Sequence, residues 1–200
     1  MYYLADLESL EEKDKKIHLN DYYIFKNGFS KEECLNIIKE NQDRLSVSQQ
    51  DHTNQDKQNK SASIDFDKKN HWIYNKLCDF ARESNKNSWD FAINGFCENL
   101  EFVQYSGETR DSDAPRVDIG TNFNMSFKQY RKISFWLCLN SPDDYDGGEH
   151  LIHNYGSPIY ANKDVGTTVF FPSYLLNGVT PVTRGVKYCL RGYIFGPHFK

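Results

Sequence analysis

The sequence predicts a mainly β fold with helices near its N-terminus, an α+β chain with a jelly-roll core. Beyond Trp89, short runs rich in β-branched and aromatic residues alternate with turn signals such as Pro142–Gly148. Their spacing is typical of a sandwich or barrel rather than of βαβ units. Before them lie two stretches with apolar residues at helical spacing. The 200 residues fit a single structural domain. In it, residues 1–95 supply a strand and helices that pack on a β core formed by residues 96–200.

The N-terminal part is predicted to contain one strand and two helices. Residues 21–28 (DYYIFKNG) have the character of a short strand closed by Asn-Gly. The following Ser30-Lys-Glu-Glu pattern is that of a capping box, and its helix is expected to run to about Leu45. A second helix is expected over residues 67–84. Residues 46–63 are almost entirely polar, so we expect an exposed loop that either has no special role or serves as a lid or partner-binding segment.

The second part of the chain is predicted to consist of strands. The expected strands are residues 99–105, 116–120, 131–139, 149–154, 166–171, 175–182 and 187–195. If the last of these is a regular strand, Lys187, Cys189 and Arg191 share one face, because side chains alternate between the two faces of a sheet.

Composition excludes several classes of protein. A formal net charge of −4 lacks the basic excess of a typical nucleic-acid binder. No apolar stretch is long enough to span a membrane, and the first residues are acidic where a signal peptide would be basic. Five cysteines without a Cys-x-x-Cys pair fit neither a zinc site nor a disulfide framework. We therefore expect a cytoplasmic protein that binds neither nucleic acid nor membranes.

Residues 100–197 resemble the catalytic core of the 2-oxoglutarate/Fe(II)-dependent oxygenases, in particular the prolyl-4-hydroxylase-like branch of bacteria and phages. The matching segments are EFVQY, VDIG, RKISFWLCLNSPDDYDGGEH, GTTVFFPS and VTPVTRGVKYCLRGYIFGP. The resemblance implies a double-stranded β-helix, the jelly-roll core of that family.

The same resemblance implies a degenerate metal site. The family holds iron with two histidines and one carboxylate, of which a His-x-Asp triplet supplies the first two. Here the triplet is Arg116-Val117-Asp118, and Asn177 stands where the second histidine is expected. An arginine has no lone pair to offer a metal, so we expect Arg116 to form an ion pair with Asp118 instead. Asp118 is thus the one ligand retained. The spacing of His150 and His153 places them on opposite faces of a strand, which argues against a relocated site.

The co-substrate side of the site is better preserved. Lys187 occupies the position at which the family pairs a basic residue with the distal carboxylate of 2-oxoglutarate, and Tyr105 is a second candidate contact. Alternatively, Lys187 pairs with a core carboxylate such as Asp118 or extends outward.

The leading hypothesis is a degenerate oxygenase-like protein without cofactors, which acts as a non-catalytic binding or structural module. Its expected partner is a protein or an assembly, in the cytoplasm or, by analogy with phage relatives, in a virion. The rival hypothesis is an active 2-oxoglutarate-dependent hydroxylase with an altered Fe(II) site. A third is an anion sensor that uses Lys187 without metal. No feature of the sequence indicates an oligomeric state.

Overall fold

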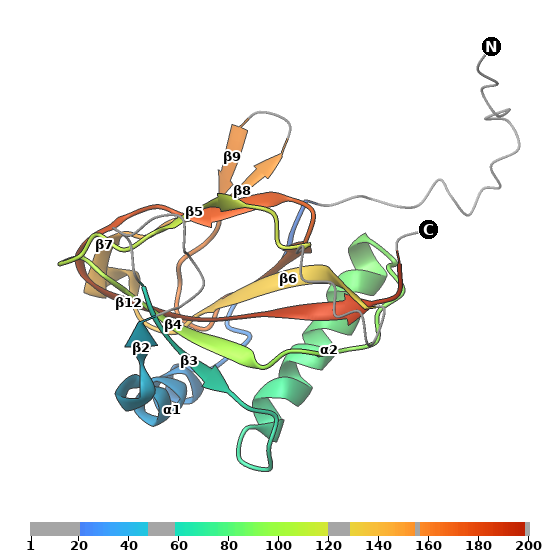
Figure 1. Ribbon diagram of the computed structural model, residues 1–200, viewed down its shortest axis with the longest axis horizontal. Coiled ribbons are helices and arrows are strands. Elements are labelled where there is room, and N and C mark those ends of the chain that lie inside the picture. Colours follow the sequence, from blue (N-terminus) through green and yellow to red (C-terminus); the bar gives the residue numbers. More distant parts are fainter. Residues whose placement is uncertain (1–20, 48–58, 120–128, 155–156, 199–200) are drawn as a thin grey trace, which may run out of the picture.

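Two antiparallel sheets and two helices make up the computed structural model, which describes residues 21–47, 59–119, 129–154 and 157–198. The major sheet has the strand order β1-β10-β6-β12-β4-β3-β2, with β7 also paired to β12. The minor sheet has the order β5-β11-β8-β9. The helices lie on the side of the major sheet that faces away from the minor sheet (Figure 1). The predicted mainly β, jelly-roll fold is confirmed.

The elements have the following bounds. They are β1 (Tyr23–Phe25), α1 (Lys31–Asn41), the 3-10 helix η3 (Gln42–Arg44), β2 (Ser46–Val47), β3 (Lys60–Ile64), α2 (His71–Ser88), β4 (Leu100–Ser106), β5 (Asp113–Arg116), β6 (Tyr130–Cys138), the 3-10 helix η4 (Pro142–Asp144), β7 (Tyr145–Gly147), β8 (His150–Asn154), β9 (Ser157–Tyr160), β10 (Thr168–Pro172), β11 (Leu176–Val179) and β12 (Val182–Gly196).

The long strands of the major sheet separate two cores by simple alternation. In β6, Phe135 and Leu137 face the helices and join the core between helices and sheet, whereas Trp136 and Cys138 belong to a cluster on the other side. In β12, Leu190 likewise faces the helices, and Cys189 lies in the interior between the two sheets. The inward positions of these strands therefore decide what chemistry the barrel interior can hold.

The helices begin and end where local chemistry dictates. The Ser30 hydroxyl accepts a hydrogen bond from the Glu33 amide, and the Glu33 carboxylate accepts one from the Ser30 amide, so the predicted capping box is confirmed. The second helix covers His71–Ser88 rather than residues 67–84. It starts late because the Asp67 carboxylate accepts a hydrogen bond from the Asn70 amide and holds the preceding residues in a turn.

The prediction of a loop over residues 46–63 is wrong at both ends. Residues 46–47 form β2, and residues 60–64 form β3, which pairs with β4 over its whole length. Ala62 and Ile64 of β3 are buried. These two apolar side chains are enough to hold β3 on the sheet because β4 provides a neighbouring strand to pair with. The middle of the predicted loop, residues 48–58, lies outside the described residues, as do residues 1–20.

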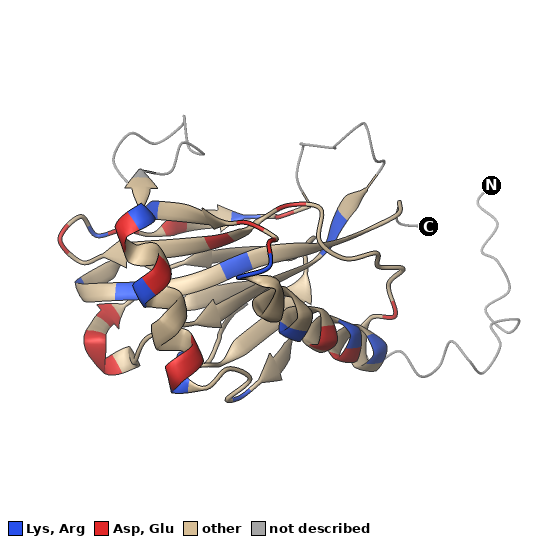
Figure 2. Cartoon of the chain, turned by 90° about the horizontal axis from the view of Figure 1, so that it is seen from below, with Lys and Arg blue, Asp and Glu red and all other residues tan. Residues whose placement is uncertain are grey.

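Other differences concern the smaller sheet and its connections. The strand expected at 116–120 lies earlier, at Asp113–Arg116, and residue 120 is outside the described part. Two short strands, β7 and β9, were not predicted, because their turn-forming residues conceal the β pattern. Lys, Arg, Asp and Glu are interspersed over the ribbon in Figure 2, without a large region of one sign in that view. No helix in the described part of the chain is both long and apolar enough to cross a membrane.

Candidate functional site

The three positions that the sequence assigns to a vestigial metal site come together between the sheets. Arg116 ends β5 and is paired with Asn177 of β11 in the minor sheet. Asp118 follows two residues later, and its backbone amide donates a hydrogen bond to the Ser173 carbonyl. Asp118 and Asn177 are 5% and 6% exposed. The local order of β5 and β11 therefore places all three side chains at one point.

At this point the Asp118 carboxylate is contacted by the two residues that replace histidines. Asn177 Nδ2 donates to Asp118 Oδ2 at 3.0 Å and to the Arg116 carbonyl at 3.1 Å. Arg116 Nε lies 3.5 Å from Asp118 Oδ1, which makes an ion pair without a hydrogen bond. The expected ion pair between Arg116 and Asp118 is thus present.

A second carboxylate, Asp113, extends this group. Its Oδ2 lies 3.4 Å from Arg116 Nη1, and it accepts hydrogen bonds from Tyr105 and Asn59. Asp113 and Arg116 are three positions apart, yet both point inward, because the pairing of β5 with β11 shifts register between Asn177 and Val179. A β-bulge inserts one residue and so changes which face the next residues occupy.

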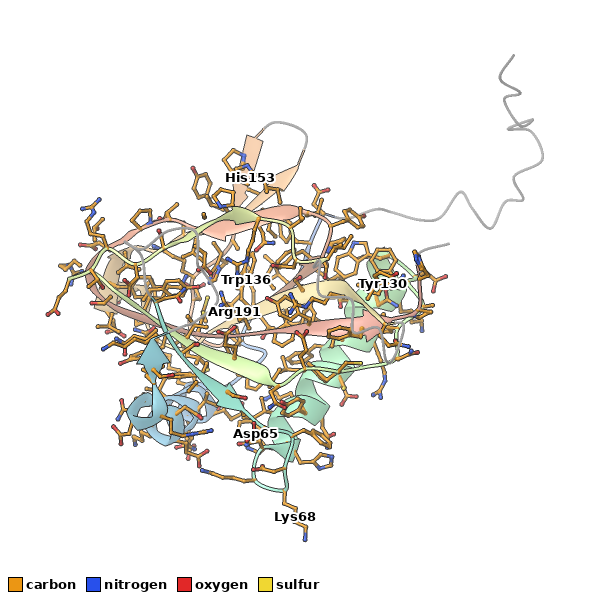
Figure 3. All side chains as sticks on the ribbon, in the orientation of Figure 1. Asp65, Lys68, Tyr130, Trp136, His153 and Arg191 are labelled. Carbon is orange, nitrogen blue, oxygen red and sulfur yellow. The ribbon has the colours of Figure 1, made fainter. Side chains whose placement is uncertain are left out.

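Arg191 links Asp113 to the far side of the interior. Its Nη1 donates to Asp113 Oδ2 and its Nε donates to Glu101 Oε2, both at 2.7 Å. Burial is the largest single influence and raises the pKa of the Asp113 and Glu101 carboxyls. Arg191 and the other partners, among them Arg116 and Tyr105 at Asp113, together outweigh it and hold both pKa values below their ordinary range. Figure 3 shows Arg191 between the two sheets, close to Trp136 in that view. Arg191, Arg116, their carboxylate partners and Asn177 thus form one continuous polar network, here called the interior network.

The two residues predicted to hold 2-oxoglutarate are both buried and hydrogen-bonded within the chain. Tyr105 is fully buried and donates its hydroxyl to Asp113 Oδ2 at 2.7 Å. Lys187 is also fully buried, and its Nζ donates to the Gly148 carbonyl at 2.5 Å. Burial lowers the pKa of the Lys187 ammonium. In the part of the chain that the structure describes, no carboxylate lies within ion-pair distance of it, so its predicted pairing with Asp118 is not found.

The histidines on β8 face opposite sides, as expected. His150 is 3% exposed and stacks on Trp136, with ring centroids 4.2 Å apart and an interplanar angle of 8°. His153 lies toward the β8–β9 hairpin, away from Trp136 (Figure 3). His150 is thus a buried residue whose position on β8 faces the barrel interior.

Trp136, His150 and Asp118 surround a very small cavity. The cavity measures about 20 Å³, which leaves room for about one water molecule. Three buried atoms of its walls have no hydrogen-bond partner, namely Trp136 Nε1, His150 Nε2 and Asp118 Oδ1. The space beside the carboxylate is therefore occupied almost entirely by the protein's own side chains.

These residues do not fit an Fe(II) centre made of two histidines and one carboxylate. Of the three positions only Asp118 offers a strong ligand for iron, since Arg116 has no lone pair and Asn177 presents its amide nitrogen to the carboxylate. Among the described residues, no three His, Cys, Asp or Glu side chains are grouped so that they could hold a metal ion.

Sequence reasoning brought Arg116, Asp118 and Asn177 together correctly but missed Asp113, Glu101 and the interior role of His150. Alternation along β12 had already placed Arg191 on the inward face with Lys187. No sequence signal pointed to the bulge that turns Asp113 inward.

Comparison of the sequence with known proteins finds relatives that match part of the chain. No protein-family model matches the chain. A PKHD-type hydroxylase of Rhizorhabdus wittichii is 34% identical over 82 residues, which cover 41% of this chain and 34% of that protein. Another, from Rippkaea orientalis, is 37% identical over 97 residues, which cover 48% of this chain and 42% of that protein. The chain thus spans well under half the length of these curated relatives.

Solved structures match over nearly the whole chain, at low sequence identity. A Pseudomonas putida prolyl-4-hydroxylase gives a TM-score of 0.68 at 16% identity and covers 90% of this chain and 94% of its own. The viral collagen prolyl hydroxylase of Paramecium Bursaria Chlorella virus-1, in its 2OG complex, gives a TM-score of 0.63 at 18% identity, with coverage of 88% and 97%. The chain therefore has the fold of the prolyl-4-hydroxylase group of 2-oxoglutarate/Fe(II) oxygenases and, over part of its length, resembles PKHD-type hydroxylases in sequence.

Proposed function

We propose that this chain is a non-catalytic relative of the 2-oxoglutarate/Fe(II) oxygenases that acts as a binding or structural module. One observation carries the proposal: the guanidinium of Arg116 and the amide of Asn177 face the Asp118 carboxylate, where metal ligation requires lone pairs. In this family the metal supplies the oxidative chemistry. A scaffold without the metal retains shape, surfaces and loops, which are what a binding or structural role uses.

The partner that this proposal implies is another protein or an assembly. A cytoplasmic complex and a phage particle are the two settings that we consider. The alternative function is hydroxylation by an altered Fe(II) site, for which Asp118 would be the remaining strong ligand.

Metal binding and co-substrate turnover distinguish the two functions. The wild-type chain is titrated with Co(II), whose visible absorption reports coordination, and is then assayed with Fe(II), 2-oxoglutarate and oxygen for succinate. We expect no stoichiometric cobalt spectrum and no succinate above the protein-free rate. The variant Arg116→His/Asn177→His restores the family's ligand set and is expected to gain the cobalt spectrum. Stoichiometric metal and sustained succinate formation by the wild type would refute the proposal.

A second candidate function, binding of a carboxylate anion without metal, is favoured by Lys187. Its ammonium is fully buried and has a backbone carbonyl as its hydrogen-bond acceptor, whereas buried charges are normally paired. Thermal unfolding with millimolar 2-oxoglutarate tests this function. It predicts a rise in Tm for the wild type that is absent in Lys187→Met, and an unchanged wild-type Tm would exclude it.

A further inference from the structure

A second hollow lies at the surface between α1 and η4 and shares no residue with the interior cavity. Its volume of about 490 Å³ falls in the range of ordinary ligand pockets, which is roughly 300–1,000 Å³. We call it the α1–η4 groove. The residues of its wall that matter here are Lys31 and Leu35 of α1, Pro142 and Asp143 of η4, and Asp164 and Val165 of the segment before β10.

Part of the lining of the α1–η4 groove is apolar. Leu35 is 51% exposed, although the neighbouring α1 residues Cys34, Ile37 and Ile38 are buried in the core. Pro142 and Val165 also line the hollow and are only partly buried. Covering such a surface with another apolar side chain stabilises a complex by about 25 cal/mol for each Å² removed from water.

The same groove carries carboxylates that have no ion-pair partner among the described residues. Asp143 accepts a hydrogen bond from the Ser141 hydroxyl, and Asp164 accepts one from the Asn162 amide. Both donors are neutral. Within the described ranges, no Lys, Arg or His lies within ion-pair distance of Asp143 or Asp164, and Lys31 forms no ion pair across the groove.

We propose that the α1–η4 groove docks a short segment of a partner protein in which a large apolar side chain adjoins Lys or Arg. The apolar side chain would cover Leu35 and Val165, and the cationic group would reach Asp143 and Asp164. Charge complementarity selects this occupant over an acidic segment, and the exposed leucine selects it over a purely basic one. The inference does not depend on the proposed function, because the groove and the interior network have no residue in common.

Synthetic peptides provide a direct test. The probe is a fluorescein-labelled Gly-Lys-Lys-Leu-Lys-Lys-Gly peptide, and binding is followed by fluorescence anisotropy at low ionic strength. Two control peptides replace the leucine with serine or all lysines with glutamate. We expect saturable binding of the probe with Kd on the order of 10–100 μM, weakening with added salt, and at least a fivefold loss of affinity for either control peptide.

Variants of the protein locate the binding. Asp143→Asn/Asp164→Asn and Leu35→Ser should each weaken probe binding by about five- to tenfold. The matched control Asp79→Asn, an exposed carboxylate on α2, should leave it unchanged. In ¹⁵N-labelled protein, the amide shifts that move with the peptide should cluster around the groove.

The proposal is wrong if the probe does not saturate at millimolar concentration, if the glutamate peptide binds equally well, or if the groove variants bind like the wild type. Sedimentation showing a dimer that Leu35→Ser dissociates would assign the groove to a second copy of the chain and would also overturn it.

Discussion

Arg191 is the residue whose removal tests the interior network most directly. The variant Arg191→Met keeps most of the side chain's length and removes the charge that Glu101 and Asp113 share. The side chains of Arg191, Glu101 and Asp113 are 12%, 20% and 9% exposed. Both carboxylates would then remain in the interior without the guanidinium that holds them at 2.7 Å.

The expected decrease in the free energy of unfolding is large because the variant removes only one partner of each buried ion pair. Removing one partner of a buried ion pair typically costs about 3–5 kcal/mol, since the remaining charge stays desolvated. For a chain of about 200 residues each kcal/mol lowers Tm by roughly 2–4 °C, so we expect a decrease of roughly 6–20 °C.

Urea unfolding followed by circular dichroism measures the effect, with Arg184→Met as the matched control. Arg184 makes an ion pair of similar length, 2.7 Å, with Asp146, but the side chains are 59% and 58% exposed. Exposed pairs contribute about 0–1 kcal/mol. If Arg191→Met costs no more than Arg184→Met, the interior network contributes little to stability and the reasoning fails.

The interior network also predicts the direction in which the stability of the folded state changes with pH. Burial raises the pKa of Asp113 and Glu101, but Arg191 together with the other partners of these carboxylates outweighs it, so both folded-state pKa values lie below their ordinary values of 3.8 and 4.5. A carboxyl with a lowered pKa stabilises the folded state at neutral pH, and this contribution is lost as the pH falls through that acidic range. In Arg191→Met the loss of stability on acidification should be smaller than in the wild type. An unchanged dependence of stability on pH would contradict the role assigned to Arg191.

Two further predictions concern single side chains. Burial, together with the nearby cations Lys187 and Arg191, holds the pKa of His150 well below its ordinary value of 6.5, so wild-type stability should fall as the pH drops below that value, and His150→Gln should flatten this slope in urea titrations. Gly166 has φ +78° and an added Cβ would lie 1.9 Å from the Phe29 carbonyl oxygen, whereas Gly95 also has positive φ but open space. Gly166→Ala should therefore lower Tm clearly more than Gly95→Ala, and equal effects would show that strain rather than contact decides.

The alternation of side chains along each strand made most of the strands predictable from the sequence. It also predicted that three side chains of the last strand share one face. The pattern of β12 is strictly local, and it correctly placed Lys187, Cys189 and Arg191 on one face. The convergence of Arg116, Asp118 and Asn177 followed from the resemblance to a known family, in which strand pairing is already fixed.

Features that depend on distant pairing could not be predicted. Glu101 meets Arg191 because β4 and β12 are neighbours with these two residues in register, and nothing in either strand specifies the other. Asp113 faces inward through a bulge that appears only when β5 pairs with β11. The strand β3 contains little apolar surface, so its existence depends on the edge that β4 offers.

The charges of the interior bear on how a metal site could be restored. The interior network together with Lys187 contains three cations and three carboxylates, namely Arg116, Lys187 and Arg191, and Glu101, Asp113 and Asp118. A neutral imidazole at position 116 would leave this balance negative by one charge, and a bound cation would then be favoured. With Arg116 present, two unit charges 4 Å apart repel by about 4 kcal/mol at an effective dielectric constant of 20, and a divalent ion by about twice that. Asn177→His alone should therefore fail to bind Co(II), whereas Arg116→His/Asn177→His should bind it. Equal cobalt affinity of the two variants would show that the missing ligand at position 177, and not the guanidinium charge, excludes the metal.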